Sequence, residues 1–188
     1  MMDPAKIALF DMDGTLVDFD GQMERDMRKL QSPSESPYRR LPGDEDVPYL
    51  DERMKLIRRQ IGWWKNLPKY QPGWDVLQIA REIGFNITIL TKGPYNTTSA
   101  WTEKVEWCRR ELPDAKVTIT EDKSTAYGRV LVDDWIPYVE PWLEVRPRGI
   151  VIMPAHRWNE SFIHTRVVRY DGTNLDVVRR ALQTAFDR

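Results

Sequence analysis

Paired aspartates follow two short apolar runs that have the composition of buried strands. Asp11 and Asp13 come directly after the run Ile7–Phe10, and the pair Asp133–Asp134 follows the run Val130–Val132. Ligands of an open parallel sheet bind beyond the carboxyl ends of its strands, so we expect these carboxylates to meet at one edge. Clustered carboxylates repel one another unless a cation is present, and oxygen ligands of this kind suit Mg²⁺. The spacing therefore predicts a magnesium site.

A hydroxyl group and an ammonium group are predicted at the same edge. Thr91 ends a third apolar run, which begins at Asn86, and Lys123 precedes Asp133 by ten residues in a loop able to reach it. Lys116 is an alternative cation, but it begins a strand and is expected at the far end. Lys123 is therefore the expected partner of the carboxylates.

Short apolar runs alternate with helical patterns along most of the chain, which is typical of a parallel sheet covered by helices. The predicted strands lack strict alternation of polar and apolar residues, as expected for strands buried on both faces. They are Ile7–Phe10, Asn86–Leu90, Val117–Thr120, Val130–Val132 and Ile150–Met153. The predicted helices are Trp74–Ile83, a helix ending before Pro113 with Trp101, Val105, Cys108 and Leu112 on its apolar face, and a last helix from about Asn174. The fold class is α/β, a three-layer, Rossmann-like α/β/α core with a parallel sheet.

The stretch between Val17 and Pro72 breaks this alternation, because it contains two helical patterns and a Pro/Ser-rich connection. Its second helix has an apolar stripe formed by Leu50, Met54, Ile57, Ile61 and Trp64. Its basic residues are mixed with Asp51 and Glu52, which indicates a solvated face; they are Arg53, Lys55, Arg58, Arg59 and Lys65. We interpret residues 17–72 as a small helical cap, inserted after the first strand, and residues 1–16 and 73–188 as the core.

The acidic pairs, Thr91 and Lys123 resemble, in their order, the four motifs of the haloacid dehalogenase superfamily of phosphotransferases. The sequence is most similar to the 5′(3′)-deoxyribonucleotidases, in the segments DMDGTLVDF, WWKNLPKYQPGW, EKVEWCRREL and TEDKSTAYGRVLVDD. The similarity covers roughly residues 5–135 and extends to the AHRWN segment at 155–159.

The resemblance implies a phosphomonoester hydrolase that works through an aspartyl-phosphate. Asp11 is then the nucleophile, and Asp13 protonates the leaving oxygen and later deprotonates the attacking water. Thr91 and Lys123 are expected to bind phosphate oxygens. The implied cofactor is Mg²⁺, held by the carboxylate of Asp11, the backbone carbonyl of Asp13 and the carboxylate of Asp134.

The resemblance also implies a small-molecule substrate, a deoxyribonucleoside monophosphate, and aromatic side chains that stack on its base. Phe19 lies where the nucleotidases place a base-stacking Phe. Trp63 and Trp64 are candidates for the same role, although Trp64 also continues the apolar stripe. Lys92 and Gly93 stand where the family usually has a small polar residue and a Pro, so the phosphate pocket gains a positive charge.

Two other functions stay open. One is a superfamily phosphatase acting on a different small phosphate ester or on a polynucleotide end. The other is a catalytically idle member that binds single-stranded nucleic acid through the helix containing Trp63 and Trp64. The formal net charge of −1 argues against broad nucleic-acid binding. A homodimer is compatible with the sequence.

The composition of the 188-residue chain, 41% apolar and 30% charged, is that of a soluble globular protein. No apolar run approaches the length that spans a bilayer, so we expect no membrane partner and a cytoplasmic location. The single Cys108 is expected to pack in a core. His156 and His164 lack metal-ligand spacing and are expected to be ordinary surface or core residues.

Overall fold

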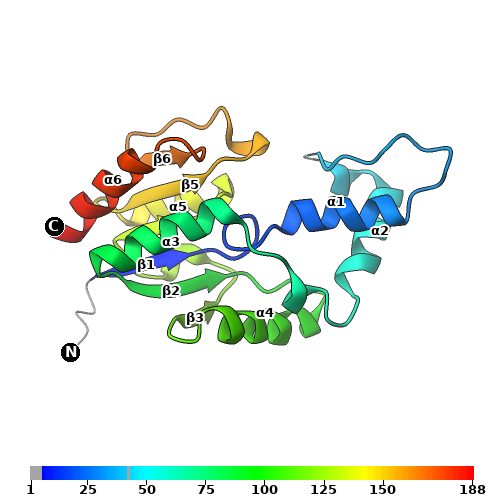
Figure 1. The fold of residues 1–188 in the computed structure, drawn as a ribbon, viewed down its shortest axis with the longest axis horizontal. Coiled ribbons are helices and arrows are strands. Elements are labelled where there is room, and N and C mark those ends of the chain that lie inside the picture. The colour runs from blue at the N-terminus through cyan, green and yellow to red at the C-terminus, as the bar shows by residue number, and fades with distance from the viewer. Residues whose placement is uncertain (1–5, 42) are drawn as a thin grey trace.

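The computed structural model describes residues 6–41 and 43–188, and its centre is a six-stranded parallel sheet. The strand order is β3–β2–β1–β4–β5–β6 (Figure 1). The strands are β1 Ile7–Phe10, β2 Asn86–Thr91, β3 Lys116–Ile119, β4 Val130–Val132, β5 Ile150–Pro154 and β6 Val167–Tyr170. The five predicted strands are confirmed to within one residue at each end. The sixth, β6, was not predicted, because it is a half-exposed edge strand with a charged residue in its short run.

The register of the sheet brings the ends of its three central strands together. Phe10, the last residue of β1, pairs with Ile89 of β2 on one side and with Val132 of β4 on the other. The next residue, Asp11, continues the ladder by donating its backbone N–H to the carbonyl of Val132 at 2.8 Å. The residues that follow these strands therefore share one edge of the sheet.

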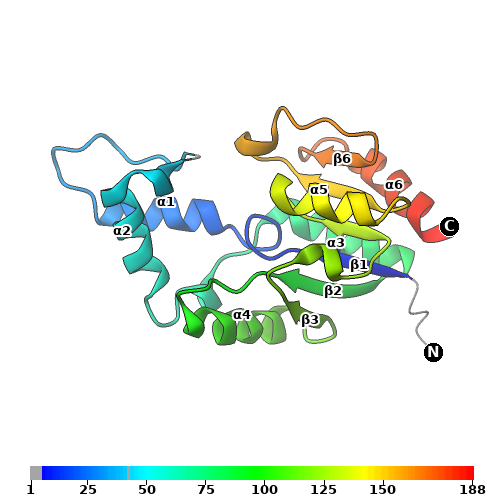
Figure 2. The same ribbon diagram turned by 180° about the vertical axis from the view of Figure 1, so that it is seen from behind.

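Helices cover both faces of the sheet, as the α/β prediction required. They are α3 Gln71–Ile83, α4 Thr98–Glu111, α5 Ile136–Val145 and α6 Leu175–Asp187. Helices α3 and α6 lie on the face turned to the viewer in Figure 1, and α5 lies on the face seen in Figure 2. Alternate residues of β1 serve the two faces: Ala8 and Phe10 join the cluster that contains α3 and α6, and Leu9 packs with α5.

Between β1 and α3 the chain forms the helical segment, by which we mean residues 17–72. Its elements are α1 Phe19–Lys29, α2 Pro48–Arg58 and two short 3₁₀ helices, η1 Asp44–Asp46 and η2 Trp64–Asn66. It extends to one side of the sheet in both views (Figures 1 and 2). Its definition as a separate cap domain stays a prediction.

The predicted apolar stripe of the second helix is wrong beyond Ile57. Helix α2 ends at Arg58, and Gly62 then takes a positive φ of 88°, a left-handed conformation that glycine adopts without strain. Ile61 is 91% exposed in the intervening turn, and Trp64 returns to the core from η2. The helical spacing of the apolar residues continues past the end of α2, although the helix itself stops at Arg58.

Two backbone contacts hold the two ends of the helical segment together. Val17 forms an antiparallel bridge with Lys69, and the backbone N–H of Asp18 donates to the carbonyl of Pro68 at 2.8 Å. Cys108 is buried in the same cluster as β1, as predicted. Among the described residues, no helix is long and apolar enough to cross a membrane.

Candidate active site

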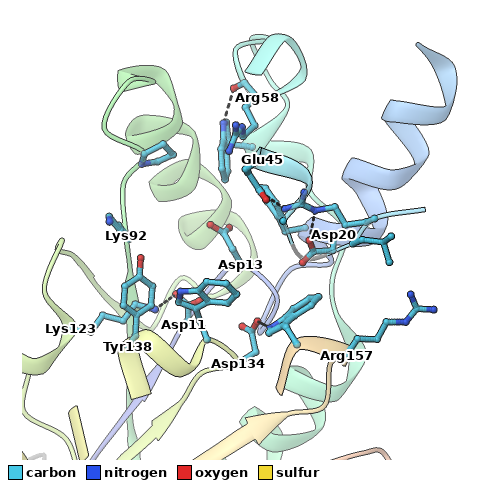
Figure 3. A pocket seen from close by; sticks show the side chains of 18 residues that line it. Asp11, Asp13, Asp20, Glu45, Arg58, Lys92, Lys123, Asp134, Tyr138 and Arg157 are labelled. Carbon is cyan, nitrogen blue, oxygen red and sulfur yellow. Dashed lines mark hydrogen bonds and ion pairs between the residues drawn. The ribbon is translucent and has the colours of Figure 1, made fainter. Parts of the chain in front are cut away.

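The edge at which β1, β2 and β4 end gathers the carboxylates, the hydroxyl and the lysine predicted from the sequence, and Figure 3 shows Asp11, Asp13, Asp134 and Lys123 among them. Lys123, at the start of the 3₁₀ helix η3 Lys123–Thr125, is buried, and its Nζ lies 2.6 Å from Asp11 Oδ1 and 2.7 Å from Asp133 Oδ2. Burial alone would lower the pKa of Lys123, but the charges of Asp11 and Asp133 raise it above its ordinary value. Lys123 is therefore protonated. Lys116, the alternative cation, is exposed at the start of β3.

Three buried carboxylates lie close together at this edge, and two of them pair with Lys123. Each of Asp11, Asp133 and Asp134 has an oxygen within 4.8 Å of an oxygen of the other two. Burial raises the pKa of Asp133 to about 6, against the opposing charge of Lys123. Burial, together with the charges of Asp133 and Asp11, raises the pKa of Asp134 well above its ordinary value. The group holds more negative charge than Lys123 neutralises, which a bound cation would correct.

The hydrogen bonds of the acidic pair separate the two residues by role. Asp133 has a charged partner, because its Oδ2 accepts from the ammonium group of Lys123, and its Oδ1 accepts from the backbone N–H of Trp135 at 3.0 Å. Among the described residues Asp134 accepts from neutral donors, Thr15 Oγ1 at 3.0 Å and Trp158 Nε1 at 3.1 Å, so no lysine or arginine compensates its charge and each oxygen keeps a lone pair for a cation. Asp134 fits an oxygen-liganded Mg²⁺ better than Asp133 does.

The turn after Asp11 depends on a glycine. Gly14 has a φ of 73°, and a Cβ at this position would lie 2.6 Å from Asp134 Oδ2. The carbonyl of Gly14 in turn accepts from His156 Nε2 at 2.6 Å. Burial lowers the pKa of His156, which favours the neutral ring and a proton on Nε2. His156 is thus a partly buried structural residue that supports the turn following the candidate nucleophile.

Asp13 has a partner that the sequence analysis missed. Lys104, 1% exposed on α4, places its Nζ 2.5 Å from Asp13 Oδ2, 3.1 Å from Thr91 Oγ1 and 2.7 Å from the carbonyl of Lys92. Burial raises the pKa of Asp13, against the opposing charge of Lys104. Asp13 Oδ1 is buried and, within the described part of the chain, lacks a hydrogen-bond partner. Such an oxygen is suited to exchange a proton with a bound ligand.

The predicted buried face of α4 is partly wrong. Val105 is half-buried, whereas Lys104 and its neighbour Glu103 are buried together with Trp107 and Cys108. The available signal was the place of Lys104 in the segment EKVEWCRREL, one turn before Cys108 and therefore on the same face. A lysine on the apolar face of a helix indicates a buried partner.

A cavity of about 420 Å³ opens above the carboxylates. Of the candidate substrate-binding residues, Phe19, Trp64 and Lys92 line it. Trp63 and Gly93 are not among the lining residues: Trp63 Nε1 donates to Asp26 at 2.9 Å, and Gly93 packs tightly on a tryptophan ring. The remaining walls contain three aromatic side chains that the sequence analysis did not assign to the substrate: Trp135, Tyr138 and Trp158.

The wall formed by the helical segment is aromatic and basic. The ring centroids of Phe19 and Trp64 lie 5.5 Å apart, and Trp63 packs edge-on against both. Arg58 lines the same wall (Figure 3), so the interpretation as a solvated face is corrected for this residue alone among the basic residues of the run. Arg40 also lines the cavity, but it is paired with two carboxylates of the helical segment, those of Asp20 and Glu45.

Comparison with solved structures identifies the fold. A crystal structure described as a haloacid dehalogenase-like hydrolase from Burkholderia xenovorans matches 94% of this chain and 97% of its own, with a TM-score of 0.54 and 16% identity. The chain therefore has a haloacid dehalogenase-like fold. A phosphoserine phosphatase from T. onnurineus also matches, over 97% of this chain and 98% of its own, with a TM-score of 0.48 and 17% identity. No family model and no curated protein sequence match the chain.

Proposed function

We propose that this protein is a Mg²⁺-dependent phosphomonoester hydrolase that uses Asp11 as its nucleophile. The observation that carries the proposal is the pairing of two buried lysines with two different aspartates: Lys123 with Asp11 at 2.6 Å, and Lys104 with Asp13 at 2.5 Å. Phosphoryl transfer needs a positioned nucleophile and an array of fixed positive charges. This arrangement supplies both at the floor of a cavity.

In the first step, a carboxylate oxygen of Asp11 bonds to phosphorus while the ester bond breaks. Asp13 gives its proton to the leaving oxygen, a role that fits its raised pKa and its free Oδ1. In the second step, Asp13 takes a proton from water, the water oxygen bonds to phosphorus, and the bond to Asp11 breaks. Lys123, and Thr91 at the end of β2, hold phosphate oxygens.

The metal ligands we propose are the carboxylates of Asp11 and Asp134 and the backbone carbonyl of Asp13. A bound Mg²⁺ would neutralise charge on the phosphate oxygens. Thr15 and Trp158 orient the Asp134 carboxylate through their hydrogen bonds. Asp133 acts on this site by fixing Lys123.

The substrate we propose is a deoxyribonucleoside 5′-monophosphate. A cavity of about 420 Å³ lies in the range of small-molecule sites. Its floor carries the groups for the phosphate, and its walls carry the ring of Phe19, which can stack on a base and is supported by the nearly buried ring of Trp64. In this proposal the helical segment acts as the cap that selects the substrate.

Phosphate release from a panel of 5′- and 3′-monophosphates, ribo and deoxy, tests this function, with glycerol 2-phosphate as an ester that has no ring. We expect the highest kcat/KM for deoxyribonucleoside 5′-monophosphates. Chelation should abolish turnover and Mg²⁺ should restore it, whereas the larger Ca²⁺ should support it poorly. Full activity in chelator-treated protein would contradict the proposed metal. A preference for the ringless ester would contradict the nucleotide.

A further inference from the structure

Glu103 is a buried carboxylate that the proposed chemistry does not use. It is 6% exposed on α4, and within the described chain no lysine or arginine forms an ion pair with it. Its oxygens instead accept three backbone N–H groups, from Gly62 at 2.7 Å, Trp64 at 3.1 Å and Lys65 at 3.4 Å. A buried charge is costly unless it is compensated, and bonds from N–H groups to a carboxylate are stronger than neutral ones. Glu103 therefore fixes this stretch of backbone strongly.

The stretch that Glu103 holds, residues 62–65, places the Trp64 ring in the cavity wall. Gly62 begins it with its left-handed φ of 88°, and η2 follows. The Trp64 ring is anchored at its other end as well, where Nε1 donates to the carbonyl of Arg58 at 2.9 Å (Figure 3). Phe19 packs against the same ring. The position of this wall depends on a contact between residues about forty positions apart.

Lys104, the next residue of α4, connects this wall to the candidate acid. Its Nζ lies 4.9 Å from the centroid of the Trp64 ring, a cation–π distance, and also bonds to Asp13. Successive helical side chains point about 100° apart, so one turn of α4 can reach two structures at once. Glu103 holds the turn behind Trp64, and Lys104 lies between the Trp64 ring and Asp13.

We propose that Glu103 is a positioning residue that sets the substrate range of the enzyme. By fixing residues 62–65, it holds the Trp64 ring, which is 2% exposed, and with it the Phe19 ring that packs against Trp64 and lines the cavity, so that Phe19 can stack on a flat ring system of the substrate. This inference rests on the proposed function, because it concerns the substrates of the same site. Without Glu103 the phosphate-binding floor keeps its contacts, but the aromatic wall is no longer held at a fixed position relative to that floor.

The test is Glu103→Gln, which keeps the size of the side chain and removes its charge. The amide –NH₂ of Gln is a donor and cannot accept a hydrogen bond, so at least one of the backbone N–H groups loses its acceptor. The matched control is Glu106→Gln on the exposed side of the same helix, where the carboxylate pairs with Lys65 at 3.3 Å. Each variant is assayed with a deoxyribonucleoside 5′-monophosphate and with glycerol 2-phosphate. Hydrogen exchange of the peptide covering 60–67 is compared with that of β1.

We expect Glu103→Gln to raise KM for the nucleotide by at least about fivefold, with kcat and the glycerol 2-phosphate activity little changed. Exchange in the peptide covering 60–67 should be faster by at least about tenfold and exchange in β1 unchanged. Glu106→Gln should match the wild type in every measurement. The split between KM and kcat is the signature of positioning.

Three results would overturn the inference. One is an equal loss on both substrates accompanied by faster exchange in β1, which indicates a merely structural role. Another is unchanged exchange in the peptide covering 60–67, which shows that Glu103 does not fix it. The third is faster exchange with unchanged nucleotide KM, which shows that the wall does not select the substrate. Wild-type protein that releases phosphate from none of these esters would contradict the proposed function itself, and the exchange measurement would still decide whether Glu103 holds the turn.

Discussion

The floor of the cavity is made of short segments that follow strands, whereas its upper wall comes from the helical segment. In the floor, Asp11, Lys123 and Asp133 arrive from three separate places in the chain and are all buried. In the upper wall, Arg40 lines the cavity but pairs with Asp20, a member of the same helical segment. The floor is thus held by the sheet, whereas the wall is held partly by ion pairs within the helical segment and partly by Glu103 of α4.

This difference indicates a division of labour between the two regions. Groups fixed by the topology of a sheet keep one arrangement, which reaction chemistry needs. A wall built on one segment can change its side chains while the floor is preserved. We therefore expect changes in the floor to affect every substrate and changes in the wall to affect only the choice among substrates.

The largest effect is expected for Asp11→Asn, which keeps the shape of the side chain and removes the proposed nucleophile. Turnover of every phosphate ester should fall by several orders of magnitude, at saturating metal, in a steady-state phosphate-release assay. The variant keeps an oxygen that can accept from Lys123, so its thermal midpoint should stay close to that of the wild type. Retention of more than about a tenth of the activity would contradict the assigned nucleophile.

The next largest effect is expected for Lys104→Met. The change removes the cation that holds Asp13 beside Thr91, and a misplaced catalytic group costs on the order of 10²-fold in rate. Nucleotide and ringless ester should be affected alike in kcat. The control is Lys116→Met, because Lys116 is exposed at the start of β3; this variant should behave as the wild type. A selective loss on nucleotides would instead assign Lys104 to the wall.

The floor could be predicted from the sequence because its positions follow from topology alone. Once β1, β2 and β4 are neighbours in a parallel sheet, the residues after them must meet, whatever packs around them. The position of Lys123 required one further inference, that the loop before β4 is long enough for its side chain to reach the carboxylates. The site residues on this edge required no knowledge of side-chain packing.

The wall could be predicted only in part, because its contacts join residues distant in sequence. Glu103 bonds to Gly62, and Lys104 bonds to Asp13; neither spacing has a local pattern. Helix α5, which follows the acidic pair, was missed for a different reason: Pro141 lies inside it and masks the helical pattern. Where packing decides, a stripe of apolar residues gives too little information, as Ile61 showed.

A smaller effect, confined to nucleotides, is expected for Phe19→Leu and for Trp64→Leu. Stacking on a base is worth about 1–3 kcal/mol, so kcat/KM should fall roughly 5- to 150-fold. Glycerol 2-phosphate, which has no ring, should be hydrolysed at the wild-type rate. If both activities fall together with the thermal midpoint, these side chains act as core. If neither falls, the base binds elsewhere.

The smallest effect is expected for Trp63→Phe, which separates the two adjacent tryptophans. Trp63 is outside the cavity lining, and its Nε1 donates to Asp26 at 2.9 Å on α1. Removing this hydrogen bond should lower the free energy of unfolding by about 0.5–1.5 kcal/mol, measured by denaturant titration. The ratio of kcat/KM between the nucleotide and glycerol 2-phosphate should stay within about twofold of the wild type, because the Phe ring still packs edge-on against Phe19 and Trp64. A change in that ratio as large as the one expected for Trp64→Leu would show that Trp63 also contacts the substrate, and the wall would then include both tryptophans.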